Sequence, residues 1–166
     1  MENCRRFYLS NCTPSLKVLI TCLVVTLGIG YGVSMLQAHN RGSFNFKKTV
    51  VHFRGSDTDE SGIYLPQSST TMISVAHVHT FTQPLLIASM GFLFALTRLS
   101  EGFKIGGILM AFLGSLFSNM APWLIREISP SFVTLLYGGG AAMLVAFVIM
   151  ALRVLFEVWL VPKNLD

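Results

Sequence analysis

Four long apolar segments constrain this chain more than any other feature of its sequence. They cover about residues 16–36, 73–98, 103–124 and 132–155. Each reaches the roughly 20 residues that a helix needs to cross about 30 Å of hydrocarbon. Only 12% of the 166 residues are charged, against roughly a quarter in soluble domains. The sequence therefore predicts an all-α polytopic membrane protein, with four transmembrane helices in a single domain over residues 1–166.

The first apolar segment resembles a secretory signal peptide in outline, because positive charges precede it at Arg5, Arg6 and Lys17. Its apolar run is about 20 residues, however, and the apolar region of a signal peptide is roughly 7–15 residues long. No small-residue cleavage site follows in MLQAHN, where Leu36 stands two residues before Ala38. We therefore expect this segment to be retained as the first transmembrane helix.

The links between the segments predict how the helices are arranged. Short links join the last three segments, which favours an up-down bundle. Only the link at about residues 40–71 is long. Its first part, SFNFKKTVVHF, is rich in aromatic and β-branched residues and turn formers follow it, so we expect a short strand or hairpin in an outer loop.

The basic residues predict the orientation. With the N-terminus inside, the inner side would hold seven of them: Arg5, Arg6, Lys17, Arg98, Lys104, Arg153 and Lys163. The outer side would hold five: Arg41, Lys47, Lys48, Arg54 and Arg126. Because basic residues near helix ends favour the cytoplasmic side, this distribution predicts an N-in/C-in protein. The net charge of +4 then reflects topology, and we expect no nucleic-acid partner.

The cysteines exclude two kinds of site. Cys4, Cys12 and Cys22 form no C-x-x-C pair, so the patterns of a c-type haem attachment and of a zinc finger are both missing. Glycines on the last two helices, at positions 106–107, 114 and 138–140, predict close helix contacts. Arg153 and Glu157, four residues apart, are typical of a surface ion pair.

Polar residues are concentrated in the outer half of the predicted bundle. The residues concerned are Tyr31, Met35, His39, His77, His79, Thr82, Gln83, Ser115, Asn119, Arg126, Thr134 and Tyr137. Polar side chains inside a membrane are costly and usually face the bundle interior. Pro84 and Pro122 lie at similar depth, and each deprives a carbonyl of its helical partner. We expect the two prolines to kink their helices and to open a pocket in this layer.

All four histidines, His39, His52, His77 and His79, fall on the predicted outer side. Imidazole ligates haem iron, copper and zinc. His77 and His79 point about 200° apart on a helix, so one of them could pair with His39 as the axial ligands of a b-type haem, with Arg126 beside a propionate. A copper site from His39, His52, one of the paired histidines and Met35 is the other metal hypothesis. Quinone contact and plain structural roles stay open.

Three segments carry a resemblance to a known family. PSLKVLITCLVVTLGIGYGVSMLQ, VVHFRGSD and AHVHTFTQPLLIASMGFLFALT resemble a family of small bacterial membrane proteins with an H-x-H helix start, some of which carry a translation-factor label. The resemblance is good over residues 14–97 and loose beyond. Members occur with multihaem cytochromes and respiratory components, so it implies a redox association and marks His52, His77 and His79.

Two functional hypotheses follow. The first is a redox or respiratory subunit, with b-type haem or copper at the outer histidines and with quinone or periplasmic cytochromes as partners. The second is a cofactor-free accessory subunit that docks into a larger membrane complex. Both favour a non-catalytic subunit or electron carrier over a stand-alone enzyme, and both imply contact with lipid and with other subunits.

Overall fold

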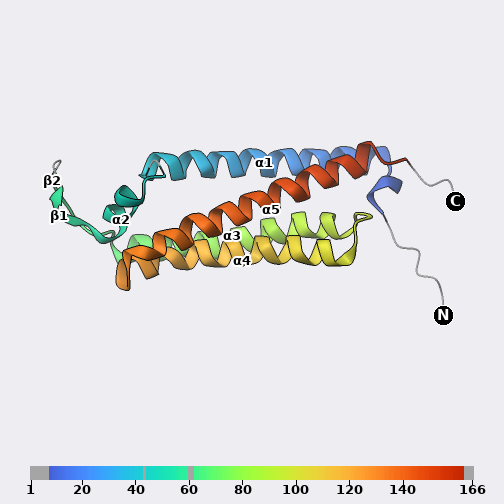
Figure 1. Cartoon of the computed structure of the whole chain (residues 1–166). Helices are drawn as coiled ribbons and strands as arrows, with labels where there is room; N and C mark the ends of the chain where they lie inside the picture. The colour runs from blue at the N-terminus through green and yellow to red at the C-terminus, as the bar shows by residue number, and fades with distance from the viewer. Residues whose placement is uncertain (1–7, 43, 60–61, 163–166) are drawn as a thin grey trace.

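The computed structural model describes residues 8–42, 44–59 and 62–162 (Figure 1). Its four long helices are α1 (Pro14–Gly42), α3 (Ser69–Ala95), α4 (Glu101–Glu127) and α5 (Val133–Trp159). The short helix α2 (Phe46–Arg54) and the strands β1 (Ser56–Asp59) and β2 (Gly62–Tyr64) join α1 to α3. The 3-10 turns η1 (Leu9–Asn11) and η2 (Pro130–Phe132) precede α1 and α5. The expectations for Cys4, Arg5, Arg6 and Lys163 concern residues outside the described range.

All four long helices are long and apolar enough to cross a membrane. The candidate spans are Pro14–Gln37, Ser69–Ala95, Glu101–Glu127 and Pro130–Trp159. This confirms the prediction of an all-α membrane protein with four transmembrane helices. The ends of the helices differ from the predicted ends by a few residues. Capping explains one shift, because the Ser68 hydroxyl accepts a hydrogen bond from the Thr71 N–H at 3.2 Å and starts α3 ahead of the apolar run.

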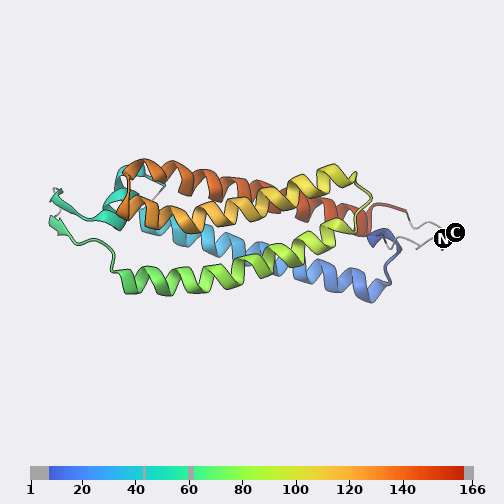
Figure 2. The same ribbon diagram turned by 90° about the horizontal axis from the view of Figure 1, so that it is seen from below.

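The helices alternate in direction, as the short links predict. Figures 1 and 2 show both described ends of the chain at one end of the bundle, with α2 and the hairpin at the other. We call these the terminal end and the loop end. The helix α4 packs on both α3 and α5, whereas α1 packs mainly on α5 and α2. As a result α1 is the least buried of the four spans, with 11% of its apolar window buried against 28% in each of the others.

Two glycines set the closest helix contact, between α4 and α5. A Cβ on Gly114 would lie 2.7 Å from the Gly139 carbonyl oxygen, and one on Gly139 would lie 2.8 Å from the Gly114 carbonyl oxygen. Small residues let helix backbones approach in this way inside a membrane. The prediction holds for this pair but not for all of the glycines, because a Cβ on Gly106 or Gly138 would meet no atom within 4 Å.

The terminal end is held by a buried carboxylate. Glu157 on α5 is 0% exposed and accepts hydrogen bonds from the Arg98 backbone N–H at 3.0 and 2.9 Å and from the Arg153 guanidinium at 3.2 Å. The Arg98 guanidinium also donates to the Ser10 hydroxyl at 2.8 Å. The predicted ion pair between Arg153 and Glu157 therefore forms, but the expectation that it lies at the surface is wrong for Glu157. The α3–α4 link folds over Glu157 and removes it from solvent, which spacing along one helix cannot indicate.

At the loop end, the structure differs from the expectation of a strand at the start of the long link. The segment around Phe46–Arg54 is the helix α2 and not a strand, whereas the predicted hairpin does form, two residues further on, between β1 and β2. The Asn45 side chain caps α2 by accepting from the Lys48 N–H at 3.2 Å. Gly55 ends it with φ +77°, a conformation that favours glycine. Thr49 is buried against α5, so tertiary packing outweighs the β propensity of the segment.

Candidate functional site

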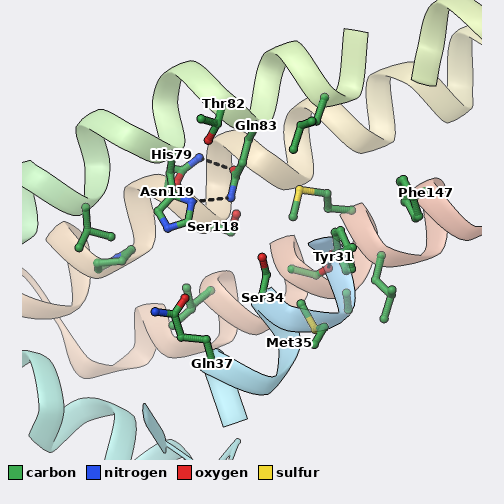
Figure 3. Close-up of a pocket in the computed structure, with 18 of the residues that line it drawn as sticks. Tyr31, Ser34, Met35, Gln37, His79, Thr82, Gln83, Ser118, Asn119 and Phe147 are labelled. Carbon is green, nitrogen blue, oxygen red and sulfur yellow. Dashed lines mark hydrogen bonds between the residues drawn. The ribbon is translucent and has the colours of Figure 1, made fainter. Parts of the chain in front are cut away.

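A cavity of about 910 Å³ lies between α1 and α3, with α4 and α5 forming its other walls and α2 closing the loop end. Its wall on α3 extends from Met72 to Met90, which at 1.5 Å per residue is about 27 Å. The volume lies within the roughly 300–1,000 Å³ that is typical of small-molecule sites. The cavity exists because α1 and α3 both pack against α5 and leave a slot between them (Figure 3).

The lining of the cavity changes along its length. Among the described residues, none of the lining side chains is Lys, Arg, Asp or Glu. The half toward the loop end holds most of the polar lining residues, among them Ser34, Gln37, Thr49, His52, Gln67, His79, Gln83, Asn119 and Tyr137, beside apolar ones such as Phe53 and Met72. The part toward the terminal end is apolar and includes Leu27, Leu86, Ile87, Met90, Ala111, Met143, Phe147 and Met150. The cavity therefore has one end suited to a hydrogen-bonding group and one suited to a hydrocarbon chain.

A polar network crosses the bundle at the middle of the cavity. The Gln83 Oε1 atom accepts hydrogen bonds from the Ser115 hydroxyl at 2.7 Å and from the Asn119 amide at 2.8 Å. The Gln83 Nε2 atom lies 3.2 Å from His79 Nδ1. Figure 3 shows the side chains of His79 and Gln83 on α3 and of Asn119 on α4 reaching toward the same space. The network ties α3 to α4 and places the imidazole of His79 on the wall of the cavity.

The network bears on the tautomer of His79. Because Gln83 Oε1 accepts from two donors, the amide nitrogen of Gln83 is the atom that faces His79. An amide nitrogen only donates, so with this orientation of the Gln83 amide His79 Nδ1 accepts, and a neutral ring then carries its proton on Nε2. In that tautomer Nε2–H is the donor group of the ring. A neutral histidine that ligates a metal needs its ligating nitrogen unprotonated.

Aromatic side chains and one hydrogen bond close the loop end of the cavity. The hydroxyl groups of Thr49 on α2 and Tyr137 on α5 lie 2.7 Å apart. The rings of Phe44 and Phe46 pack on Tyr137, with centroids 6.1 and 5.1 Å away. This contact anchors α2 across the end of the bundle and positions His52 at the cavity wall.

The structure separates the predicted site residues into two groups. His52, His79 and Met35 line the cavity. His77 is exposed on the other side of α3 and packs edge-on against Phe81, at 5.1 Å between centroids, which fits the opposite directions predicted for the two histidines. His39 is exposed near the end of α1 and lies 5.7 Å from the ring of Phe44. Neither His77 nor His39 is among the lining residues.

Arg126, the residue predicted beside a haem propionate, is engaged elsewhere. Its guanidinium donates to the Gln67 carbonyl oxygen at 2.8 Å and pairs with Glu127 at 3.1 Å. It thereby fixes the segment before α3 to the end of α4. Across the part of the chain that the structure describes, no group of three His, Cys, Asp or Glu side chains could hold a metal ion.

Several functional features were not predicted from the sequence. The cavity extends past the polar layer to Met90 and Met150. The sequence around these two residues is uniformly apolar and gives no indication of a cavity. Thr49 and Trp123 line it as well. A threonine within a segment expected to be a strand carries no signal of such a role, and Trp123 is visible only as one more apolar residue. By contrast, the sequence did predict that Gln83 and Asn119 lie in the same polar layer, because polar residues recur at that depth on both helices.

Comparison with known proteins gives a family. A family model described as a transmembrane helical domain, Aq_1264_TM, matches residues 43–165, which include α2 to α5. No curated protein and no solved structure matches the chain at a significant level.

Proposed function

Because the chain belongs to the Aq_1264_TM family of transmembrane helical domains, we propose that it is a multi-pass subunit of a redox complex in the bacterial inner membrane. Its cavity then holds the lipophilic redox group of that complex. The observation that carries this proposal is the His79–Gln83–Asn119 network, which presents hydrogen-bonding groups to an apolar cavity inside a membrane-spanning bundle. Polar groups at such depth are costly and are a mark of functional sites.

The redox association is supported by the resemblance of residues 14–97 to membrane proteins that occur with respiratory components. In this proposal the loop end faces the periplasm, in agreement with the distribution of basic residues, and periplasmic cytochromes are the partners there. The sequence-based hypothesis placed four histidines in one cluster. Of these, the proposal uses only His52 and His79, which line the cavity.

The residues present do not favour b-type haem or copper. His39 lies outside the lining of the cavity, and Nδ1 of His79 is already bonded to Gln83. The Arg126 guanidinium already has three partners, which are Gln67, Met72 and Glu127. Haem and copper are therefore the alternative outcomes of the test below.

A second candidate is the cofactor-free accessory subunit, which the low burial of α1 favours. Gly28 and Gly32, four residues apart, share one side of α1, and a Cβ on either would meet no atom within 4 Å. A helix with so few contacts suits docking against another membrane subunit.

The two functions differ in what accompanies the protein. The full chain is purified from native membranes in mild detergent with its partners, and is analysed by a reduced-minus-oxidised spectrum, metal analysis and solvent extraction. We expect about one redox group per chain together with redox-active partner subunits. If the sample contains neither haem, nor copper, nor extractable quinone, the redox proposal is overturned and the accessory role takes its place.

A further inference from the structure

We propose that the cavity binds an uncharged, long-chain lipophile with a carbonyl-bearing head, which is the chemistry of a membrane quinone. This inference rests on the proposed function in that it concerns the same cavity. It adds the class of the ligand, the direction in which the ligand lies, and the residue that recognises its head.

The absence of charge in the lining selects a neutral ligand. None of the described residues that line the cavity is Lys, Arg, Asp or Glu. A phosphate or carboxylate head placed there would lose its hydration without a counter-charge, which costs several kcal/mol or more. A phospholipid, a fatty acid and the propionates of a haem are all poor occupants for this reason.

The donors in the network select a carbonyl head. His79 Nε2–H is a donor because Nδ1 accepts from Gln83. The amide of Asn119 lies on the facing wall, and its Nδ2 donates to Gln83 Oε1 at 2.8 Å and to Ser115 Oγ at 3.4 Å, so it orients Gln83 while the imidazole is the group that meets the head. Uncharged carbonyl oxygens accept from donors of this kind. A quinone ring at this level would receive the His79 bond while its faces contact the apolar walls.

The apolar part of the cavity gives the ligand its direction. From the network toward the terminal end the lining is hydrocarbon and thioether, with Met90, Met143 and Met150 among the residues. Unbranched methionine side chains adapt to chains of varied shape. The tail of the ligand therefore lies toward the terminal end, and the head lies at His79.

Access is from the bilayer. At the loop end the cavity is closed by α2, through the 2.7 Å Thr49–Tyr137 contact and the rings of Phe44 and Phe46. Along its side the cavity is bounded by α1, which packs mainly on α5 and α2. A lipophile dissolved in the membrane reaches the slot between α1 and α3 without crossing water.

The two tryptophans provide a direct assay. Trp123 lines the cavity, whereas Trp159 lies exposed at the end of α5. The full-length Trp159→Phe variant is reconstituted in phosphatidylcholine nanodiscs and titrated with decylubiquinone, whose quinone ring quenches indole fluorescence. We expect saturable quenching of Trp123. Ubiquinone-0, which has no tail, should bind at least about tenfold more weakly, because each buried CH₂ contributes about 0.8 kcal/mol.

Matched variants locate the head. His79→Ala should weaken decylubiquinone binding about tenfold, the equivalent of one buried hydrogen bond. His77→Ala, two residues away and outside the cavity lining, should leave it unchanged. If His79→Ala does not fold, Ala76→Phe serves instead, because Ala76 lines the cavity on the same helix and a phenylalanine there fills it.

Oleate and dioleoylglycerol complete the test. Oleate carries a charge and should not compete, whereas dioleoylglycerol is neutral and should compete weakly. Quenching that never saturates, or that is equal in His79→Ala and His77→Ala, overturns the inference; so does dioleoylglycerol binding as tightly as the quinone. Failure here, with haem or copper found in the native complex, overturns only this inference. Success here, with no redox group in the native complex, overturns only the proposed function.

Discussion

Gln83 Nε2 lies 3.2 Å from His79 Nδ1, one helical turn away on α3. With the amide nitrogen facing the ring, a neutral imidazole carries its proton on Nε2. This orientation of the amide depends on α4, since Ser115 and Asn119 both donate to the Gln83 oxygen. The chemistry that the cavity receives from His79 thus depends on Gln83 and on the two α4 side chains that orient its amide. Such supporting contacts typically matter about as much as the residue that they orient.

Gln83→Leu should weaken decylubiquinone binding about tenfold, although Gln83 itself need not touch the ligand. The substitution removes the donor to His79 Nδ1 and lets the ring adopt either tautomer. Titration of Trp123 fluorescence in the Trp159→Phe background measures the effect. Ser89→Ala is the control, because the Ser89 hydroxyl bonds only within α3, to the Leu85 carbonyl at 2.8 Å, and is not among the lining residues. Equal affinities in the two variants would disprove the orienting role.

Glu157→Ala should lower the free energy of unfolding by about 3 kcal/mol or more. It removes the acceptor of the Arg98 N–H and of the Arg153 guanidinium in a fully buried place. Thermal unfolding in detergent gives the change. Glu127→Ala, in which the lost carboxylate is 61% exposed and pairs with Arg126, should cost less than about 1 kcal/mol. A Glu157→Ala protein as stable as Glu127→Ala would show that the buried carboxylate does not hold the terminal end together.

Gly114→Ala should destabilise the α4–α5 contact by about 1–3 kcal/mol, because the added Cβ collides with backbone atoms of α5 that cannot rotate away. Gly106→Ala, on the same helix but with no atom within 4 Å of the added carbon, should be neutral or stabilising, since alanine is the better helix former. The two unfolding temperatures in one detergent test this. The reverse order would contradict the packing described above.

Tyr137→Phe should loosen α2 while leaving the long helices intact. The variant loses the 2.7 Å contact with Thr49, which is worth about 1 kcal/mol. Hydrogen exchange followed by mass spectrometry should show several-fold faster exchange in Phe46–Arg54 and little change in α5. Thr134→Val, whose hydroxyl bonds the nearby Ser131 carbonyl, is the control. Unchanged exchange in α2 would mean that the aromatic contacts alone hold it.

Cys12, just before the first span, should react slowly with maleimide. Burial raises the pKa of its thiol, and Lys17 offsets this only in part. A raised pKa leaves less thiolate at any given pH, so the rise in labelling rate should occur at a higher pH than for an ordinary thiol. The measurement uses a Cys4→Ser/Cys22→Ser protein between about pH 7 and 10. Thr13→Cys, added after Cys12→Ser, provides an exposed comparison; the same pH profile for both would contradict the burial.

The transmembrane architecture could be predicted because its signal is local. Four apolar runs of about 20 residues each are typical of helices that cross a bilayer. Short links between them force neighbouring helices to be antiparallel. The polar layer was predictable for a related reason, since polar residues at the depth of His79 and Gln83 are conspicuous in apolar helices. The sequence could not predict which hydrogen-bond partner each polar group has.

The remaining features depend on packing between distant segments. Phe46–Arg54 has strand-like composition, and becomes a helix because Asn45 caps it and Thr49 reaches Tyr137, 88 residues away in sequence. Glu157 is buried by the α3–α4 link, which no spacing rule on α5 reveals. The separation of His39 from His79 follows from α1 packing mainly on α5 and α2 rather than closely on α3.

The most direct test of the account is the quinone content of the protein taken from its native membrane. Wild-type, His79→Ala and His77→Ala proteins are purified in parallel, extracted with organic solvent, and their quinone is quantified per chain. The account predicts about one quinone per chain in the wild type and in His77→Ala, and a loss of most of it in His79→Ala. Equal quinone in all three proteins, or none in the wild type, would contradict it.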